Sequence, residues 1–441
     1  MKAASLGLVF FPAFDWAITP THPEREERLL YTRDQIVEEG LLDLPAIKEY
    51  RPQLAGLADI ERVHIGVPNI ESLITDAHLL SAGGAIAAAQ AVMRREVTNA
   101  FALVRPPGHH AMRVVHGTRG FCTINIEAVM VEYLRRHYGV QRIAIVDTDV
   151  HHGDGTQDIF YHDPDTLFIS FHQDGRTLYP GTGAMSELGS PGAFCSTVNI
   201  PLPPGTTDAG LHEVLDRLVL PMLEDFRPDM IINSAGQDNH YSDPLANMAV
   251  TAQGYARLAE KLKADIAVLE GGYSIEDALP YVNTGIILAM AGLDYSRVIE
   301  PDNARCPRQS VATTNYIAKL VAEWQDIWQG RDRLRREAVA KAGGWWQQRR
   351  NIYYDDSGIQ ERQTETVRLC PRCHGYQLID TQAQGYPFGM KSAFAAIIPR
   401  NSCPACRAQA RDAVHKARQA GRHDCCFIQD KQEDILVPCG T

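Results

Sequence analysis

The sequence lacks any run of about twenty apolar residues, the length that a membrane-spanning helix needs. It is also short of basic residues: 43 Lys and Arg stand against 54 Asp and Glu, and the formal net charge of −11 argues against a general nucleic-acid binder. The apolar run at residues 6–11 is short and is followed by Pro12 and Asp15, so we expect a core strand there and not a signal peptide. These absences predict a cytoplasmic protein.

Cysteine is scarce over most of the chain and concentrated towards its C-terminal end. Cys122, Cys195 and Cys306 stand alone, whereas seven of the ten cysteines fall between Cys370 and Cys439. Such uneven usage is typical of metal binding in a reducing compartment and not of a secreted disulfide framework.

Short apolar runs alternate with helix-like segments along most of the 441 residues. The predicted strands are 6–11, 100–104, 143–146, 167–171, 230–233 and 266–269, and the predicted helices are 84–95, 126–137, 210–226 and 251–263. This alternation predicts an α/β fold of three layers, with a mostly parallel central sheet covered by helices on both faces. In such sheets, ligands bind beyond the carboxyl ends of the strands.

The composition changes after a last amphipathic segment at 315–328. Residues 1–328 are expected to form the main domain, 329–361 a charged helical connector, and 362–441 a cysteine-rich unit with a basic helix. The charges support this division, because residues 361–441 hold 11 Lys and Arg against 8 Asp and Glu, a net of +3, and the rest of the chain holds 32 against 46, a net of −14.

The strongest chemical signal follows the predicted strand at 143–146. Asp147, Asp149 and His151 occupy every second position, and in an extended segment such residues point to one side. They would repel one another or stay badly desolvated unless a cation lay among them. Carboxylate and imidazole donors suit zinc, and three protein ligands leave a position for water. The alternative, a solvated turn rich in Asp and His, is disfavoured because the preceding Val/Ile run belongs in a core.

Further polar and aromatic groups are expected at the same rim. Residues 105–110, Arg-Pro-Pro-Gly-His-His, present two histidines after a stiff turn, where a surface pair is the alternative. Asp238 offers the natural third zinc ligand, although it could instead cap a turn. Tyr273 follows a Glu-Gly-Gly turn, and the rings of Phe121 and Tyr179 stand on loops, where ordinary packing is the simpler explanation for either ring alone.

Together these motifs resemble the classical zinc-dependent histone deacetylase family, which has the arginase/deacetylase fold. The Arg-Pro-Pro-Gly-His-His and Glu-Gly-Gly-Tyr forms are similar to its class II branch and to the related bacterial amidohydrolases. The resemblance spans residues 6–328, including an early loop at 21–29, and it is specific because separate motifs occur in the same order.

The resemblance implies a role for each of these residues. Asp149, His151 and Asp238 would hold the catalytic zinc, and His109 and His110 would be the tandem histidines, with His110 as general base and then general acid. Asp147 and Asp154 would orient His109 and His110, and Tyr273 would bind the oxyanion. Gly120, Phe121 and Tyr179 would form the walls of the acyl-lysine tunnel. Asp147 and Ser170 would also help to bind a structural potassium ion.

The implied reaction is zinc-dependent hydrolysis of the amide between an acetyl or other short acyl group and a lysine side chain of a protein. Two carboxylates leave the zinc site near neutral, so the metal acidifies its water less than an all-histidine site would, and a base such as His110 is needed. Zinc and Tyr273 would stabilise the oxyanion, and losing one such donor typically costs ~10²–10³ in rate.

Two positions depart from the family pattern. Gln237 precedes the third zinc ligand, where an apolar residue is more usual, and Leu245 occupies a tunnel-rim position that is acidic in polyamine-selective relatives. Leu245 therefore favours acyl-lysine in peptides or proteins, and a small-molecule amidohydrolase that cleaves acetylpolyamines is the alternative. The intact set of site residues disfavours a non-enzymatic scaffold. The tandem histidines disfavour a dimetal hydrolase of the arginase type.

Two Cys-x-x-Cys knuckles, 370–373 and 403–406, are separated by 29 residues. Their four thiolates, from Cys370, Cys373, Cys403 and Cys406, predict a closed structural zinc site of the zinc-ribbon type, and four unrelated thiols or a redox pair are less expected. Cys425, Cys426 and Cys439 are unexplained, with a further metal site beside His423 as one alternative.

Residues 407–422 are predicted to form a basic helix. The simpler interpretation of its charges is that they form a solvated face of the helix. The alternative is a docking surface for an acidic partner or nucleic acid. The aromatic pairs at 345–346 and 353–354 are expected to pack the connector onto a domain or onto a second subunit, so a homo-oligomer is one expectation.

Overall fold

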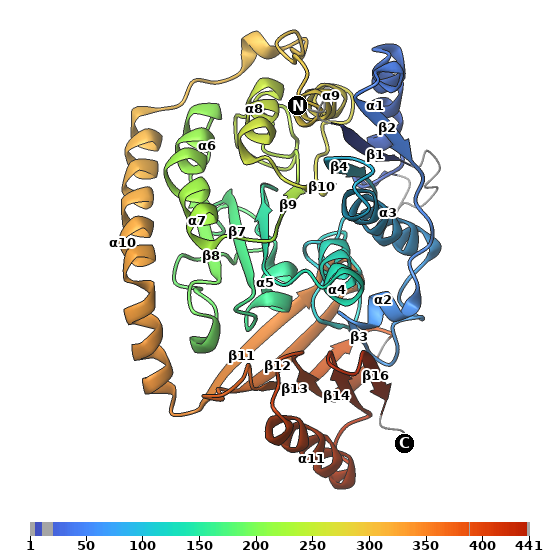
Figure 1. Ribbon diagram of the computed structural model, residues 1–441, viewed down its shortest axis with the longest axis vertical. Coiled ribbons are helices and arrows are strands. Elements are labelled where there is room, and N and C mark those ends of the chain that lie inside the picture. Colours follow the sequence, from blue (N-terminus) through green and yellow to red (C-terminus); the bar gives the residue numbers. More distant parts are fainter. Residues whose placement is uncertain (1–4, 11–20, 388, 439–441) are drawn as a thin grey trace.

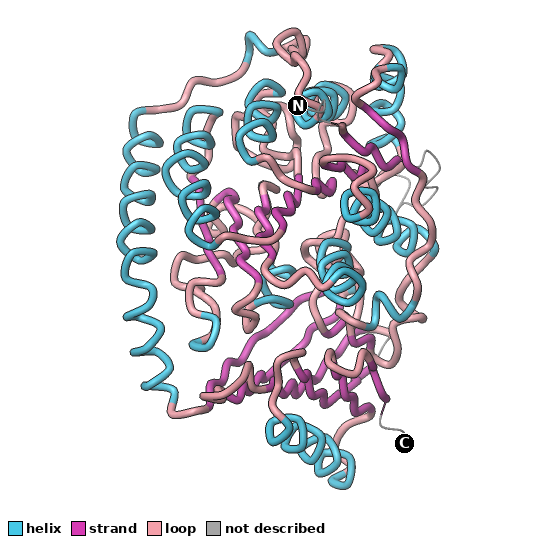
Figure 2. The backbone as a smooth tube through the Cα atoms, in the orientation of Figure 1, coloured by secondary structure: helices cyan, strands magenta, loops and turns pink. Residues whose placement is uncertain are grey.

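The computed structural model describes residues 5–10, 21–387 and 389–438 (Figures 1 and 2). Its main body is an eight-stranded sheet in the order β2-β1-β4-β10-β9-β6-β7-β8, and all neighbouring strands are parallel. The strands are β1 (Leu6–Phe10), β2 (Ile47–Tyr50), β4 (Asn99–Leu103), β6 (Ile143–Asp147), β7 (Thr166–Gln173), β8 (Thr197–Leu202), β9 (Met230–Ala235) and β10 (Ile266–Leu269). The expected α/β class is confirmed; position 11 of the first predicted strand lies outside the described residues.

Helices cover both faces of this sheet and complete three layers (Figure 1). One face carries α2 (Leu57–Glu61), α3 (Asp76–Met93), α4 (Ile126–Tyr138) and α5 (Asp154–Phe160). The other carries α1 (Glu27–Glu38), α6 (Asp208–Val214) with the π-helical turn Leu215–Val219, α7 (Leu220–Phe226), α8 (Ala252–Leu262), α9 (Leu279–Met290) and α10 (Val311–Ala342). Within the described ranges, no helix is both long and apolar enough to cross a membrane.

The buried strands are apolar because each supplies both cores. On β6, Ala144 and Val146 join the core on one face, whereas Ile143 and Ile145 join the core on the other. Successive side chains of a strand point to opposite faces, so a strand that is covered on both sides must be apolar throughout. This is the property that makes these strands visible in the sequence.

The sequence does not predict the two edge strands, β2 and β8. On β2, Lys48 and Glu49 are exposed, and β8 contains Asn199 and Pro201, so neither strand is a continuous apolar run.

The connector expected to be helical over 329–361 is helical only as far as Ala342, and its later part is corrected. Helix α10 ends at Ala342, and Gly343 and Gly344 follow it with φ values of +59° and +90°, a conformation that stops a helix and suits glycine. The chain then enters a long strand, β11 (Trp345–Tyr354), and not a further helix. The cysteine-rich unit therefore gains a strand that the sequence assigns to the connector.

The C-terminal unit is a six-stranded sheet in the order β11-β12-β13-β14-β15-β16 (Figures 1 and 2). Its pairs are antiparallel except β14 with β15, which are parallel and joined by α11 (Pro404–Ala420). Its other strands are β12 (Ile359–Arg368), β13 (Tyr376–Gly385), β14 (Gly389–Ile398), β15 (Cys425–Asp430) and β16 (Ile435–Pro438).

The inner face of the C-terminal sheet packs against the main body. Ile379 and Ala395 share a buried cluster with Ile65 and Val114, which lie on the short parallel pair β3 (Ile65–Gly66) and β5 (Val114–Val115). A second cluster joins Met112 of the main body to Ile352, Tyr354, Ile359 and Ala383 of the sheet. The C-terminal sheet is therefore docked through apolar side chains.

Candidate active site

The four central strands of the main sheet, β4, β10, β9 and β6, bring the predicted site residues to one edge. His109 and His110 follow β4, Tyr273 follows β10, Asp238 follows β9 and residues 149–151 follow β6. Because these strands are parallel and adjacent, their carboxyl ends open on the same side of the sheet. Residues far apart in the sequence therefore meet there.

Asp149, His151 and Asp238 form a buried group of metal-ligand type. Their candidate ligand atoms all lie within 4.8 Å of one another. His151 Nδ1 is 3.1 Å from both Asp149 Oδ1 and Asp238 Oδ2. Burial lowers the pKa of His151, but hydrogen bonds to the two carboxylates outweigh it and raise the pKa to about 10. Two carboxylates that converge on one imidazole nitrogen are the donor set that a divalent cation stabilises, so the group fits a metal ion.

Backbone amides hold these carboxylates in place. The Gly271 N–H donates to Asp149 Oδ2 at 2.8 Å, and the Val150 N–H donates to Asp238 Oδ1 at 2.9 Å. A Cβ at Gly271 would lie 2.3 Å from Asp238 Oδ2, and one at Gly236 would lie 2.0 Å from Asp149 Oδ2. Glycine is required at both positions because the carboxylates approach the backbone so closely.

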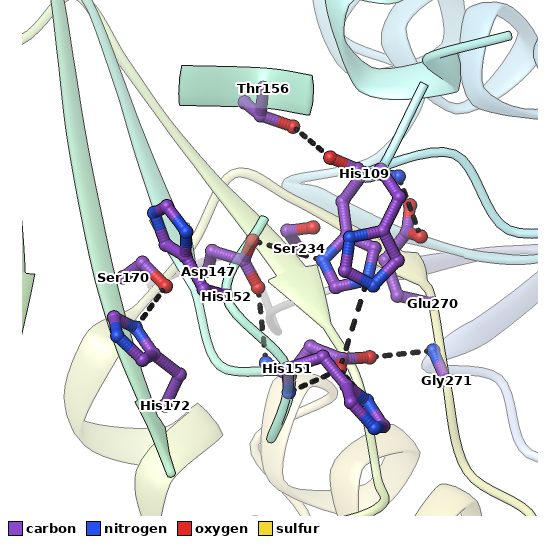
Figure 3. Close-up of polar contacts among 12 residues, drawn as sticks. His109, Asp147, His151, His152, Thr156, Ser170, His172, Ser234, Glu270 and Gly271 are labelled. Carbon is purple, nitrogen blue, oxygen red and sulfur yellow. Dashed lines mark hydrogen bonds and ion pairs between the residues drawn. The ribbon is translucent and has the colours of Figure 1, made fainter. Parts of the chain in front are cut away.

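Asp147 lies next to this group but does not join it. It is the last residue of β6, and its Oδ2 is 3.2 Å from His109 Nδ1 while its Oδ1 accepts the Asp149 N–H at 3.1 Å (Figure 3). The expected convergence of Asp147 with the following residues is corrected, because the extended strand ends here and the chain turns. Ser170 lies opposite Asp147 on β7, with its Oγ 2.9 Å from His172 Nδ1. The potassium site stays a prediction.

The tandem histidines differ in charge. His110 Nδ1 lies 2.8 Å from Asp154 Oδ1, and burial together with the neighbouring His109 lowers the pKa of His110 to about 3. Burial also lowers the pKa of His109, but Asp149 and Asp147 outweigh it and raise that pKa to about 9. His110 is thus neutral at neutral pH. With the proton assigned to Nδ1 by the contact with Asp154, its Nε2 is left as an acceptor.

Glu270 holds the turn that carries these histidines. Its Oε2 accepts the His109 N–H at 3.1 Å (Figure 3) and the Gly108 N–H at 2.7 Å. Burial and the nearby Glu127 raise the pKa of Glu270 well above its usual value. Sequence reasoning missed this role, which depends on β10 lying beside β4 in the sheet.

Arg119 is a second partner that sequence reasoning missed. Its Nε and Nη2 donate to Asp154 Oδ2 at 3.2 and 2.6 Å, and its Nη1 donates to the carbonyl of Tyr353. Burial alone would raise the pKa of Asp154, but Arg119 and then His110 hold it well below its usual range. Arg119 therefore keeps Asp154 ionised as the partner of His110.

Replacing Arg119 with alanine is expected to move the acid limb of the kcat/KM profile to higher pH. Arg119 is the neighbour that most lowers the pKa of Asp154, so losing it raises that pKa, and removal of a nearby positive charge also favours protonation of the adjacent His110. A protonated His110 cannot accept a proton from water, so activity falls away at a higher pH than in the wild type. Arg119→Lys keeps the charge and should shift the limb less. Superimposable profiles for the wild type and Arg119→Ala would contradict this role.

Tyr273 is buried, with 8% of its surface exposed, and burial raises the pKa of its phenol well above the usual value. The phenol therefore keeps its proton and is available as a hydrogen-bond donor. Asp243 fixes the backbone here, because its Oδ2 accepts the Tyr273 N–H at 2.7 Å and its Oδ1 accepts the N–H of the half-buried Leu245 at 2.9 Å. The guanidinium carbon of Arg28 lies 5.0 Å from the centre of the Tyr273 ring.

Two half-buried aromatic rings stand beside these groups. The centre of the Phe121 ring lies 5.6 Å from that of Tyr273, and the centre of the Tyr179 ring lies 5.2 Å from that of His110. Gly120 has a φ of +50°, and a Cβ there would lie 2.5 Å from His110 Cδ2. Glycine thus lets this loop approach His110, and the predicted wall residues meet the predicted catalytic ones.

The four knuckle cysteines form the second group of metal-ligand type in the described part of the chain. The sulfur atoms of Cys370, Cys373, Cys403 and Cys406 lie within 4.8 Å of one another. A hydrogen bond from the Cys406 backbone lowers the pKa of Cys403 to about 7, which favours a thiolate. Four clustered sulfur atoms suit a closed, tetrahedral structural zinc site.

The remaining C-terminal features give no further metal group among the described residues. His423 Nε2 lies 3.1 Å from Asp380 Oδ1, and Cys425 and Cys426 belong to strand β15. Cys439 lies outside the described residues. On the basic helix α11, Arg407 and Arg411 donate to Asp430 at 3.0 and 2.9 Å. Part of the positive charge of α11 is therefore paired with a carboxylate of the same unit.

Comparisons with known proteins agree with this geometry. The model of the histone deacetylase domain matches residues 66–290, about half of the chain. A probable deacetylase of Archaeoglobus fulgidus is 48% identical over 312 residues, which cover 65% of this chain and 86% of the relative. An acetylpolyamine amidohydrolase of Burkholderia pseudomallei is 41% identical over 201 residues, which cover 44% of this chain and 57% of the relative.

The fold has a solved counterpart. The crystal structure of the HDA15 HD domain matches with a TM-score of 0.64 at 28% sequence identity, and the match covers 77% of this chain and 98% of that domain. The central parallel sheet with helices on both faces is the arginase/deacetylase arrangement, and the cysteine cluster adds a zinc-ribbon-like unit. The chain belongs to the histone deacetylase family.

Proposed function

We propose that this chain is a zinc-dependent deacylase that removes acetyl or other short acyl groups from lysine side chains of peptides or proteins. The observation that carries the proposal is the convergence of Asp149, His151 and Asp238 next to the neutral imidazole of His110 and the buried phenol of Tyr273. Membership of a deacetylase family supports hydrolysis of an amide. The donor set of two carboxylates and one imidazole supports zinc.

A zinc ion among these ligands would polarise the acyl carbonyl and make the attacking water more acidic. His110 accepts the proton of that water at Nε2, because its Nδ1 is engaged by Asp154. Tyr273 donates its hydroxyl proton in a hydrogen bond to the oxyanion, since its raised pKa keeps the phenol protonated. His110 then returns its proton to the leaving amine, and the products are lysine and a carboxylate.

A second candidate is the hydrolysis of acetylpolyamines. One relative is an acetylpolyamine amidohydrolase, and two carboxylates, Asp355 and Asp356, lie against the loop at 120–121, where they would attract a cationic chain. Leu245 favours acyl-lysine, because it stands where polyamine-selective relatives are acidic.

A comparison of substrates tests the proposed function. We expect kcat/KM for acetyl-lysine peptides to exceed that for acetylspermidine by about tenfold or more, the scale on which one pocket contact discriminates. The reverse order would replace the first candidate with the second, and no turnover of either substrate by metal-loaded protein would remove both.

The other assignments are proposals of the same kind. The catalytic domain comprises residues 1–328, and the cysteine-rich unit, expected from residue 362, begins at Trp345 because β11 pairs with β12 along its whole length. The four knuckle cysteines hold a structural zinc ion, and Asp147 with Ser170 helps to bind potassium. A cytoplasmic location and a homo-oligomer stay predictions.

A further inference from the structure

The turn between β11 and β12 of the C-terminal sheet reaches the wall of the candidate active site. Three consecutive side chains of this turn accept three backbone N–H groups of the loop at 118–121, which lies about 235 residues earlier in the chain. The pairs are Asp355 Oδ1 with Gly120 at 3.1 Å, Asp356 Oδ2 with Phe121 at 2.8 Å, and Ser357 Oγ with Thr118 at 2.8 Å. A loop of the main domain is thus held by side chains of another unit.

The held loop carries a strained residue. Phe121 has a φ of +67°, in the left-handed region that bulky side chains rarely adopt, so its backbone needs partners to stay there. The Asp356 carboxylate supplies one such partner at the Phe121 N–H. The ring of Phe121 lies between two others, 5.6 Å from Tyr273 and 4.3 Å from His22, measured between ring centres.

The same turn also holds the opposite wall. The Tyr179 hydroxyl donates to Asp355 Oδ1 at 3.1 Å, so one carboxylate oxygen binds both Tyr179 and the Gly120 N–H. The carbonyl of Tyr353 accepts a hydrogen bond from Arg119, the partner of Asp154. The turn therefore touches both aromatic walls and the charge network of His110.

The turn is itself firmly anchored. Tyr354 is buried, and its hydroxyl lies 2.7 Å from the Val114 carbonyl and 2.8 Å from Glu361 Oε2. Ile352 and Ile359, on either side of the turn, pack in a common cluster with Met112 of the main domain. Such packing fixes the position of the carboxylates relative to the loop that they bind.

We propose that residues 353–357 of the C-terminal sheet, the end of β11 and the turn after it, are a positioning element of the active site. Asp355 and Asp356 set the positions of Tyr179 and Phe121, and through these rings they set the affinity for the acyl-lysine chain. They are positioning residues, because they act through the two rings and not on the reacting atoms. The kinetic part of this inference rests on the proposed function, and the structural part does not.

Hydrogen–deuterium exchange of the full chain tests the structural part without any substrate. In the Asp355→Ala/Asp356→Ala double variant, the amides of Gly120 and Phe121 are expected to exchange about tenfold faster or more, because these two lose their acceptors. Gln360→Ala is the matched control, since Gln360 is exposed on β12 beside the turn, and exchange at 118–121 should stay at the wild-type rate. Unchanged exchange in the double variant overturns the proposal.

Steady-state kinetics test the functional part. The double variant is expected to raise KM for an acetyl-lysine peptide about tenfold while kcat falls by less than about threefold, because the metal ligands, His110 and Tyr273 are untouched. Asp355→Asn/Asp356→Asn keeps acceptor oxygens and should restore most of the affinity. Loss of kcat with KM unchanged would overturn the positioning role. An inactive wild type would remove the proposed function. The exchange result would still show whether Asp355 and Asp356 hold the loop at 118–121.

Discussion

Replacing His110 with alanine is expected to lower kcat for an acetyl-lysine peptide by about 10²–10⁴-fold, the usual contribution of a general acid–base group. His110 combines a neutral ring, held so by a pKa of about 3, with an Nδ1 contact to Asp154 that leaves Nε2 as the acceptor. Without it, the proton of the attacking water has no placed acceptor and the leaving amine has no placed donor. KM should change little.

His110→Asn is the sharper companion variant. The asparagine amide can keep a hydrogen bond to Asp154 but cannot act as a base at neutral pH. We expect the same loss of kcat as in His110→Ala, with metal content and thermal unfolding close to those of the wild type. If only the alanine variant loses activity, His110 acts by packing and not as a base.

Replacing Tyr273 with phenylalanine is expected to lower kcat by about 10²–10³-fold, the cost of removing one donor to an oxyanion. The phenol is buried and its pKa is raised well above the usual value, so it donates a hydrogen bond without losing its proton. Because this bond strengthens only as charge develops on the carbonyl oxygen, the effect falls on kcat and not on KM.

Tyr133→Phe is the matched control for this variant. It also removes a hydroxyl, one that accepts a hydrogen bond from Gln90 Nε2 at 2.7 Å, but on α4, away from the candidate site. Its kcat should equal that of the wild type. A Tyr273→Phe variant that raises KM and leaves kcat intact would show that the phenol binds substrate instead of stabilising the transition state.

The sequence predicts the main domain well for a physical reason. Strands such as β6 are buried on both faces, so burial itself makes them continuous apolar runs. The sequence also predicts that Asp149, His151 and Asp238 lie close together, because the carboxyl ends of parallel strands share one edge of the sheet. The edge strands are not recognisable in this way, because β2 exposes Lys48 and Glu49, and β8, although buried, is interrupted by Asn199 and Pro201.

What the sequence could not predict depends on contacts between segments that lie far apart in the chain. Glu270 reaches the histidine turn only because β10 lies beside β4, and the C-terminal contacts of Asp355 and Asp356 depend on how one sheet docks on another domain. Strand β11 resembles part of a charged helix in the sequence because its middle residues, 347–350, are two Gln followed by two Arg, and the Gly343-Gly344 pair is the signal of a helix end.

Metal analysis of the purified full chain tests the central claim, that one divalent ion is bound by the two carboxylates and the imidazole at the sheet edge. We expect about two zinc ions per chain in the wild type and about one in each of Asp238→Ala and Cys403→Ser, from the ligand sets of catalytic and structural sites. Peptide deacylation should be abolished in Asp238→Ala and retained at least in part in Cys403→Ser. An active wild type with a single zinc ion that persists in Asp238→Ala and disappears in Cys403→Ser would contradict it.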